Sequence, residues 1–83
     1  MTQKWTRGGE RPKPQSGEIV GVRAYELHGT RYYALLYRLD AAPEQGREAR
    51  VSFDMIYDDP RPGDRVLVES VLGVVDRVRR WEA

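Results

Sequence analysis

The segment that most constrains the fold runs from Arg61 to Val78 and reads RPGDRVLVESVLGVVDRV. Pro62-Gly63 suits the two central positions of a type II turn, because proline fixes the first φ and glycine accepts the positive second φ. Two runs rich in β-branched residues follow, Arg65 to Ser70 and Val74 to Trp81, separated by Leu72-Gly73. We therefore expect a turn followed by a β-hairpin.

The register of this hairpin depends on its reversal. A two-residue loop would place Glu69 opposite Asp76, a like-charge pair that lowers stability. A bulge at Gly73 would shift the register by one residue and separate the two carboxylates. We expect this bulge.

Two further strands are expected upstream, from Glu18 to Leu27 and from Thr30 to Leu39. The His28-Gly29 break between them predicts an antiparallel hairpin. Gly21 indicates a bend or bulge in the first of these strands. The second carries apolar side chains on both faces, which is typical of a central strand or of one wrapped around a barrel corner.

The next expected strand is Arg47 to Met55, in which apolar and polar residues alternate. The composition of Asp40 to Gly46 predicts a loop before it, and Ile56 to Asp64 is too short for a crossover helix. The strand should have one buried face, formed by Ala49, Val51, Phe53 and Met55.

Together these patterns predict an all-β fold, a small five-stranded antiparallel barrel of the OB-like or SH3-like kind, over residues 17–83. Residues 1–16 contain glycines, prolines and one large apolar residue without strand or helix periodicity, which predicts a disordered, flexible arm. Residues 1–17 carry four basic side chains against one acidic, whereas residues 18–83 carry ten against twelve. The arm is therefore basic and the body is not.

Composition limits the classes of function. The chain has no cysteine, which excludes disulfides and thiolate metal sites. No apolar run approaches the roughly 18 residues of a membrane span, and the first residues lack the apolar core of a signal peptide. We expect a cytoplasmic protein without membrane contact.

Candidate catalytic groups are few. His28 lies in an expected turn, where histidine tolerates a left-handed backbone, so we interpret it as structural. Four carboxylates surround one loop without the spacing of a calcium site, and are better explained as turn residues that accept backbone hydrogen bonds: Asp54, Asp58, Asp59 and Asp64. Nucleotide-binding glycine loops and nucleophile triads are absent from the sequence. We expect no catalysis, metal or cofactor.

Aromatic and basic residues are the stronger functional signal. Interfaces with proteins are enriched in tyrosine and arginine, so we expect a module for protein–protein interaction or complex assembly, whose partner is another protein or a second copy in a homodimer. The alternative is binding of single-stranded nucleic acid, whose bases stack on aromatic rings. The candidate residues for either partner are Trp5, Arg7, Arg23, Tyr25, Arg31, Tyr32, Tyr33, Tyr37 and Arg38.

From Arg47 to Val78 the sequence resembles the C-terminal half of the HypC-type hydrogenase-maturation chaperones. The resemblance is carried by Pro62-Gly63-Asp64 followed by Val66-Leu67-Val68, ahead of a final hairpin. Members of that family depend on a cysteine directly after the initiator methionine, which takes part in iron handling and partner exchange. Thr2 occupies this position here. The resemblance therefore implies the OB-like barrel and not the family's activity.

Overall fold

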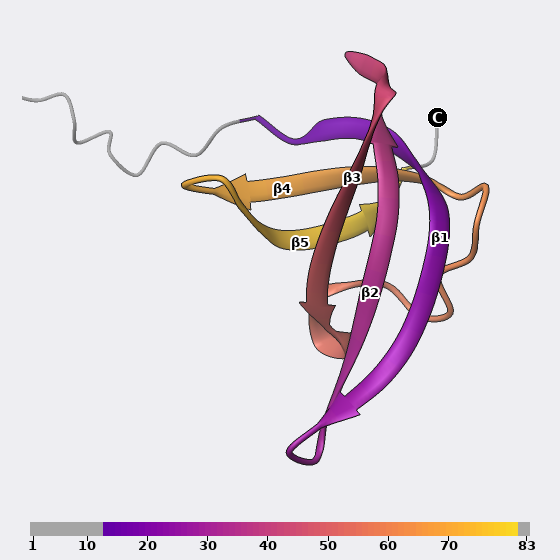
Figure 1. The fold of residues 1–83 in the computed structure, drawn as a ribbon. Helices are drawn as coiled ribbons and strands as arrows, with labels where there is room; N and C mark the ends of the chain where they lie inside the picture. Colours follow the sequence, from indigo (N-terminus) through magenta and orange to yellow (C-terminus); the bar gives the residue numbers. More distant parts are fainter. Residues whose placement is uncertain (1–12, 82–83) are drawn as a thin grey trace, which may run out of the picture.

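The computed structural model describes residues 13–81, and within them it forms one antiparallel sheet of five strands with the order β3-β2-β1-β4-β5 (Figure 1). The predicted all-β, five-stranded antiparallel architecture is confirmed. The elements are β1 (Gln15–Leu27), β2 (Thr30–Leu39), β3 (Ala42–Ser52), the short 3-10 helix η2 (Phe53–Met55), β4 (Arg65–Val71) and β5 (Val74–Arg80).

Strand β1 belongs to both halves of the sheet. Its first residues, Gln15 to Glu18, pair with β4, and the ladder with β2 runs from Gly17 to Leu27. Gly17 and Glu18 therefore pair on both sides. The β1–β2 register shifts between Ile19 and Gly21, which confirms the expected bulge near Gly21. This bulge marks a corner in β1. Beyond it, β1, β2 and β3 run across β4 and β5 (Figure 1).

The sheet is not closed into a barrel, and here the sequence-based prediction is wrong. Strands β3 and β5 are the two edges of the sheet. Within residues 13–81, the only pairing between the β3 side of the sheet and β5 is a single parallel bridge, from Ile56, which follows η2, to Val78. Closure needs a ladder between the edge strands. Strand β3 ends at Ser52 and the chain turns into η2, so the segment reaches β5 only after the strand is finished.

The predicted β1–β2 hairpin is confirmed, with Leu27 opposite Thr30. Its turn has φ values of 52° at His28 and 81° at Gly29. Two positive φ values are the mark of a type I′ turn, whose twist matches that of the strands it joins. His28 thus has the left-handed backbone conformation that its structural interpretation predicts.

The β4–β5 hairpin has a bulge, but at a different place from the one expected. Val71 faces Val74 across a tight turn, and the register shifts between Glu69 and Ser70, so that Asp76 is the extra residue on β5. Glu69 then lies opposite Arg77 instead of Asp76. The bulge therefore removes the contact between Glu69 and Asp76, as expected, because a bulge anywhere between the turn and Glu69 has this effect.

The segment from Asp40 to Gly46 differs from the predicted loop. Its turn is only Asp40 and Ala41, and β3 begins at Ala42. The β2–β3 ladder is nevertheless irregular between the Leu39–Ala42 and Tyr37–Arg47 pairs, so Pro43 to Gly46 interrupt the pairing. Regular pairing with β2 starts at Arg47.

The end of β3 also departs from the period-two pattern. The strand was expected to reach Met55, yet Phe53 is in η2 and 54% exposed. A 3-10 helix does not alternate its side chains across a sheet, so the buried row ends at Val51. The interior receives side chains from all five strands and from Ile56: Ile19, Leu35, Tyr37, Leu39, Val51, Ile56, Val66, Val68 and Val78.

A polar cluster fixes the corner where β1 leaves β4. The Asp40 carboxylate accepts hydrogen bonds from the Ser16 hydroxyl, at 2.7 Å, and from both terminal nitrogens of Arg65. These bonds, that of Arg65 above all, hold the pKa of Asp40 below its usual value. The Arg65 guanidinium lies 5.1 Å from the Trp81 ring centroid. The cluster ties the β2–β3 turn to β4 and to the end of β5.

The turn before β4 docks on β1. Gly63 has a φ of 94°, and the Asp64 amide donates to the Arg61 carbonyl at 3.2 Å, as in the predicted type II turn. The Gly63 amide donates to the Ile19 carbonyl at 2.7 Å. The Asp64 carboxylate accepts from the Tyr57 hydroxyl at 2.7 Å and from the Arg61 amide at 3.0 Å. This carboxylate is therefore a turn residue, as its position in the sequence predicted.

Candidate functional site

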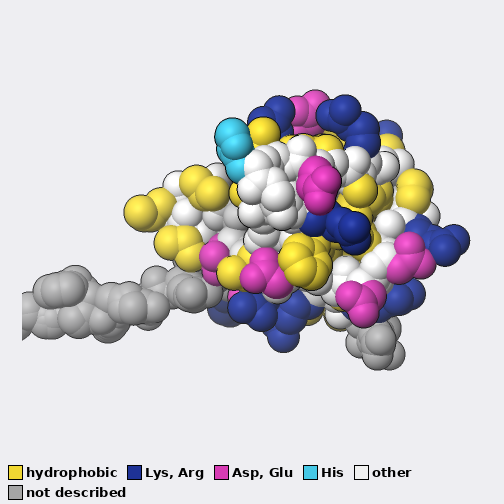
Figure 2. Space-filling model, turned by 90° about the horizontal axis from the view of Figure 1, so that it is seen from below, with side chains coloured by type: hydrophobic (Ala, Val, Ile, Leu, Met, Phe, Trp, Pro, Cys, Tyr) yellow, Lys and Arg dark blue, Asp and Glu magenta, His cyan; other side chains and the backbone are white. Residues whose placement is uncertain are grey.

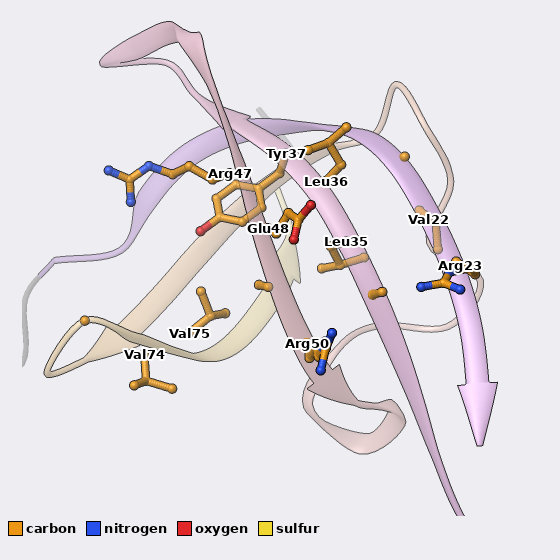
Figure 3. A pocket seen from close by; sticks show the side chains of 14 residues that line it. Val22, Arg23, Leu35, Leu36, Tyr37, Arg47, Glu48, Arg50, Val74 and Val75 are labelled. Atoms are coloured by element: carbon orange, nitrogen blue, oxygen red, sulfur yellow. The ribbon is translucent and has the colours of Figure 1, made fainter. Parts of the chain in front are cut away.

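An open cleft of about 870 Å³ lies between the inner face of β1–β3 and the first residues of β5. Its floor contains Val22, Leu35 and Ala49, which form one row because each is the cross-strand partner of the next. Val75 contributes from β5 (Figure 3). All four side chains belong to the core or pack against it. The cleft is therefore the uncovered side of the hydrophobic interior.

The cleft is bordered by the two edge strands. On the β3 side Arg47 is exposed, and on the β5 side Val74 is 68% exposed (Figure 3). The gap that a barrel would close with a ladder is thus a groove with an apolar floor and a mixed rim. Such a site can hold apolar side chains presented by an extended backbone.

The two edges differ in how available they are. Strand β5 is interrupted by its bulge at Asp76, and Val78 is already bridged to Ile56. The Arg80 guanidinium lies 5.4 Å from the ring centroid of Tyr57. Bulges and charges of this kind protect an edge from adding a strand. Among the described residues, β3 pairs with β2 alone, so β3 is the available edge.

The outer face of β1–β3 carries a second cluster. Tyr25 and Tyr32 face each other across the strands with their ring centroids 5.5 Å apart and an interplanar angle of 20°. In the next row, Arg23 and Arg50 flank the small side chain of Ala34, and these three residues also border the cleft (Figure 3). Neither arginine has an ion-pair partner within residues 13–81.

The structure separates the residues that the sequence singled out. Arg23, Tyr25, Tyr32 and Arg38 share the outer face, because their cross-strand pairs alternate with the buried row. Tyr33 is half-buried and packs against the core.

Tyr37 is 5% exposed and belongs to the interior, where it also lines the cleft, so its role as a partner-binding residue stays a prediction (Figure 3). Arg31 is exposed near the β1–β2 turn, opposite Glu26. Trp5 and Arg7, with the rest of residues 1–12, lie outside the described residues. Strand β1 begins at Gln15, inside the segment that the sequence assigned to the arm.

Sequence reasoning missed the cleft itself. Ala49 was expected on the buried face of its strand and Val75 only within a strand, and Arg47 and Val74 were not singled out, although two of the candidate residues, Arg23 and Tyr37, do line the cleft. The alternation of β3 contained a signal, since a small residue at Ala49 within a buried row leaves space above it. The open seam between β3 and β5 depends on where β3 ends. The apolar–polar alternation in the sequence continues past Ser52 to Met55, so it did not indicate that end.

A third feature is the tip of the β4–β5 hairpin. Leu72 is 93% exposed with a φ of 53°, a left-handed conformation that is rare for a bulky apolar residue. Val71 and Val74 beside it are also exposed. Figure 2 shows hydrophobic side chains gathered at this end of the molecule. The tip carries apolar surface beside the cleft at a cost in backbone strain.

Within residues 13–81 there is no group of three His, Cys, Asp or Glu side chains able to hold a metal ion. The same range has no helix with the length and hydrophobicity needed to cross a membrane.

Comparison of the chain with protein-family models, curated proteins and solved structures gives no match. The resemblance of residues 47–78 to the HypC-type chaperones therefore stays a prediction, as do the absence of catalysis and the cytoplasmic location.

Proposed function

We propose that this protein is a non-catalytic binding module that takes up an extended segment of a protein partner along the free edge of β3. The observation that carries the proposal is the edge from Arg47 to Ser52, which within residues 13–81 pairs only with β2 and which borders a cleft with an apolar floor. A sheet edge with free N–H and C=O groups is a template for another strand. Strand addition supplies main-chain hydrogen bonds, and pockets beside the edge supply specificity.

The cleft adds selectivity to this edge. A strand that paired with β3 would direct alternate side chains to the inner face of the sheet, over Ala49 and Val75. The opposite side chains would point outward, near Glu48 and Arg50. A partner segment with small or branched apolar residues at every second position fits this arrangement.

The connectivity favours an OB-like over an SH3-like relationship for the domain. Strand β1 lies between β2 and β4, and the chain after β3 meets β5 in parallel at Ile56–Val78. An OB-type barrel is a partly open, five-stranded Greek-key arrangement, and its ligands bind on the second and third strands. We propose that the present sheet has the strand order of an OB-type fold, with the seam between β3 and β5 left open.

The test is peptide selection followed by mapping. Peptides are selected from a random displayed library on the full chain, and their binding is measured by calorimetry on two variants. Val74→Asp introduces a charge at the cleft rim, whereas the matched control Leu27→Asp changes a 51% exposed residue at the far end of β1. We expect Val74→Asp to weaken binding about tenfold or more and Leu27→Asp to leave it unchanged.

Backbone NMR shifts distinguish the edge from other surfaces. Strand addition predicts the largest peptide-induced changes at the amides of Arg47 to Ser52. Peptides that bind Val74→Asp as tightly as the wild type, or that shift mainly residues of β4, would contradict the proposal.

Binding of single-stranded nucleic acid is a second candidate, supported by the Tyr25–Tyr32 stack beside Arg23 and Arg50. The two rings are partly exposed and offer stacking surface to bases, and the two guanidiniums, which have no ion-pair partner among the described residues, offer charge to phosphates. Oligonucleotide titration at two salt concentrations tests it, with Tyr32→Ala against Leu27→Ala. Salt-sensitive binding that only Tyr32→Ala removes would favour this function over peptide capture.

A further inference from the structure

The free edge of β3 is complementary to itself. Along the regular part of the strand, Glu48 and Arg50 are exposed on the outer face and flank Ala49 on the inner face. Neither charged side chain has an ion-pair partner within residues 13–81. Opposite charges two residues apart on one edge match the same two charges on an antiparallel copy.

The register of such a pair is restricted by backbone geometry. In an antiparallel ladder alternate residues direct their N–H and C=O groups toward the same neighbour. Two copies of one strand can therefore pair only when the two-fold axis passes through a residue. Strand β3 ends at Ser52, so an axis at Val51 or Ser52 would leave most of the strand without a partner, and the remaining candidate residues are Gly46, Arg47, Glu48, Ala49 and Arg50.

Charge then selects one of these axes. An axis at Arg47, Glu48 or Arg50 places that side chain opposite its own copy. An axis at Gly46 places Glu48 opposite Glu44. Only the axis at Ala49 pairs Glu48 with Arg50 of the second copy twice, with no like charges directly opposite.

We infer that two copies of this chain associate through β3, antiparallel about a two-fold axis at Ala49. This inference rests on the proposed function, since it names a second copy as the occupant of the edge. The contact is isologous and closed, so it yields a dimer and not a filament. The added strand also extends the inner face of the sheet beside Val74, which covers part of the cleft.

Charge reversal tests the pairing. Sedimentation equilibrium of the full chain, from roughly 10 µM to 1 mM, should give a monomer–dimer equilibrium. Glu48→Arg and Arg50→Glu should each weaken dimerisation about tenfold or more, because both ion pairs become like-charge contacts. An equimolar mixture of the two variants should recover a heterodimer of wild-type strength, since every pair is again opposite. Both side chains are exposed, and circular dichroism confirms that the variants are folded.

Disulfide trapping tests the axis. The chain contains no cysteine, so Ala49→Cys introduces a single thiol. Opposed Cα atoms in an antiparallel pair are about 4.5–5.5 Å apart, within the roughly 4.4–6.8 Å that a disulfide spans between Cα atoms. We expect Ala49→Cys to oxidise to a covalent dimer, and the control Gly46→Cys, on the same edge, to do so much more slowly.

The outcomes separate the two proposals. A strictly monomeric wild type, a dimer indifferent to both charge reversals, or faster trapping of Gly46→Cys would overturn the dimer. If selected peptides still bind in the cleft, the proposed function stands without the dimer. If neither peptides nor a second copy engage β3, both fail.

Discussion

Substitution of Gly17 by alanine tests the corner on which the whole sheet depends. Gly17 pairs with Leu39 on one side and with Val66 on the other. A Cβ atom there would lie 2.3 Å from the Arg38 carbonyl oxygen, where ordinary contacts begin at 3.4 Å. The backbone would have to move by about 1 Å, because the obstacle is main chain and not a flexible side chain.

Overpacking of this size costs about 1–3 kcal/mol. Replacement of a strand glycine by alanine otherwise stabilises by about 0.5–1 kcal/mol, so we expect a net loss of about 1 kcal/mol. For a domain of this length that lowers Tm by roughly 4–8 °C. The matched control is Gly21→Ala, whose Cβ would meet only the Leu36 Cβ, at 3.7 Å. It should be neutral or stabilising.

The assay is urea unfolding of both variants, followed by circular dichroism. If Gly17→Ala is as stable as Gly21→Ala, then β1 does not pass between β2 and β4 as closely as described. The two-sided pairing of β1 would then be refuted.

Two other predictions concern stability. The Tyr57 hydrogen bond holds the pKa of Asp64 below its usual value, so this carboxylate stabilises the fold above its unfolded pKa of about 3.9, and the contribution is lost as the pH falls through the folded pKa. Tyr57→Phe should therefore cost about 1 kcal/mol near pH 7 and less in acid, and a penalty that grows toward low pH in urea titrations would contradict this assignment. Leu72→Asn should stabilise the protein by up to about 1 kcal/mol, because asparagine accepts the left-handed backbone of the β4–β5 turn better than leucine. Thermal unfolding of Leu72→Asn, Leu72→Val and the wild type tests this prediction. The Tm of Leu72→Asn should be the highest of the three and that of Leu72→Val the lowest.

The turns were predictable from the sequence because glycine and proline act locally. His28-Gly29 and Pro62-Gly63 adopt the expected conformations, and β2 has the expected bounds. The bulge needed to separate Glu69 from Asp76 was also foreseen, since it follows from cross-strand charge. Its position was missed, because several positions relieve the same repulsion.

The end of β3 could not be predicted from periodicity. Phe53 continues the apolar alternation, yet it lies in η2 and is largely exposed. Whether the chain extends the ladder or turns there depends on tertiary contacts, such as the bridge from Ile56 to Val78. This single difference separates a closed barrel from an open sheet, and it also creates the cleft. The outer aromatics Tyr25 and Tyr32 could be singled out by residue type alone. The inner site could not, because it depends on where β3 ends.

The open seam is tested most directly by residue-resolved amide hydrogen exchange along β3, at a dilution where the protein is monomeric. An edge strand that bonds only to β2 predicts alternation from Arg47 to Ser52, with slow exchange at amides directed to β2 and fast exchange at the intervening ones. The central strand β2 should be protected throughout. Uniform slow exchange along β3 in the monomer would mean that the seam is closed, and would contradict the account.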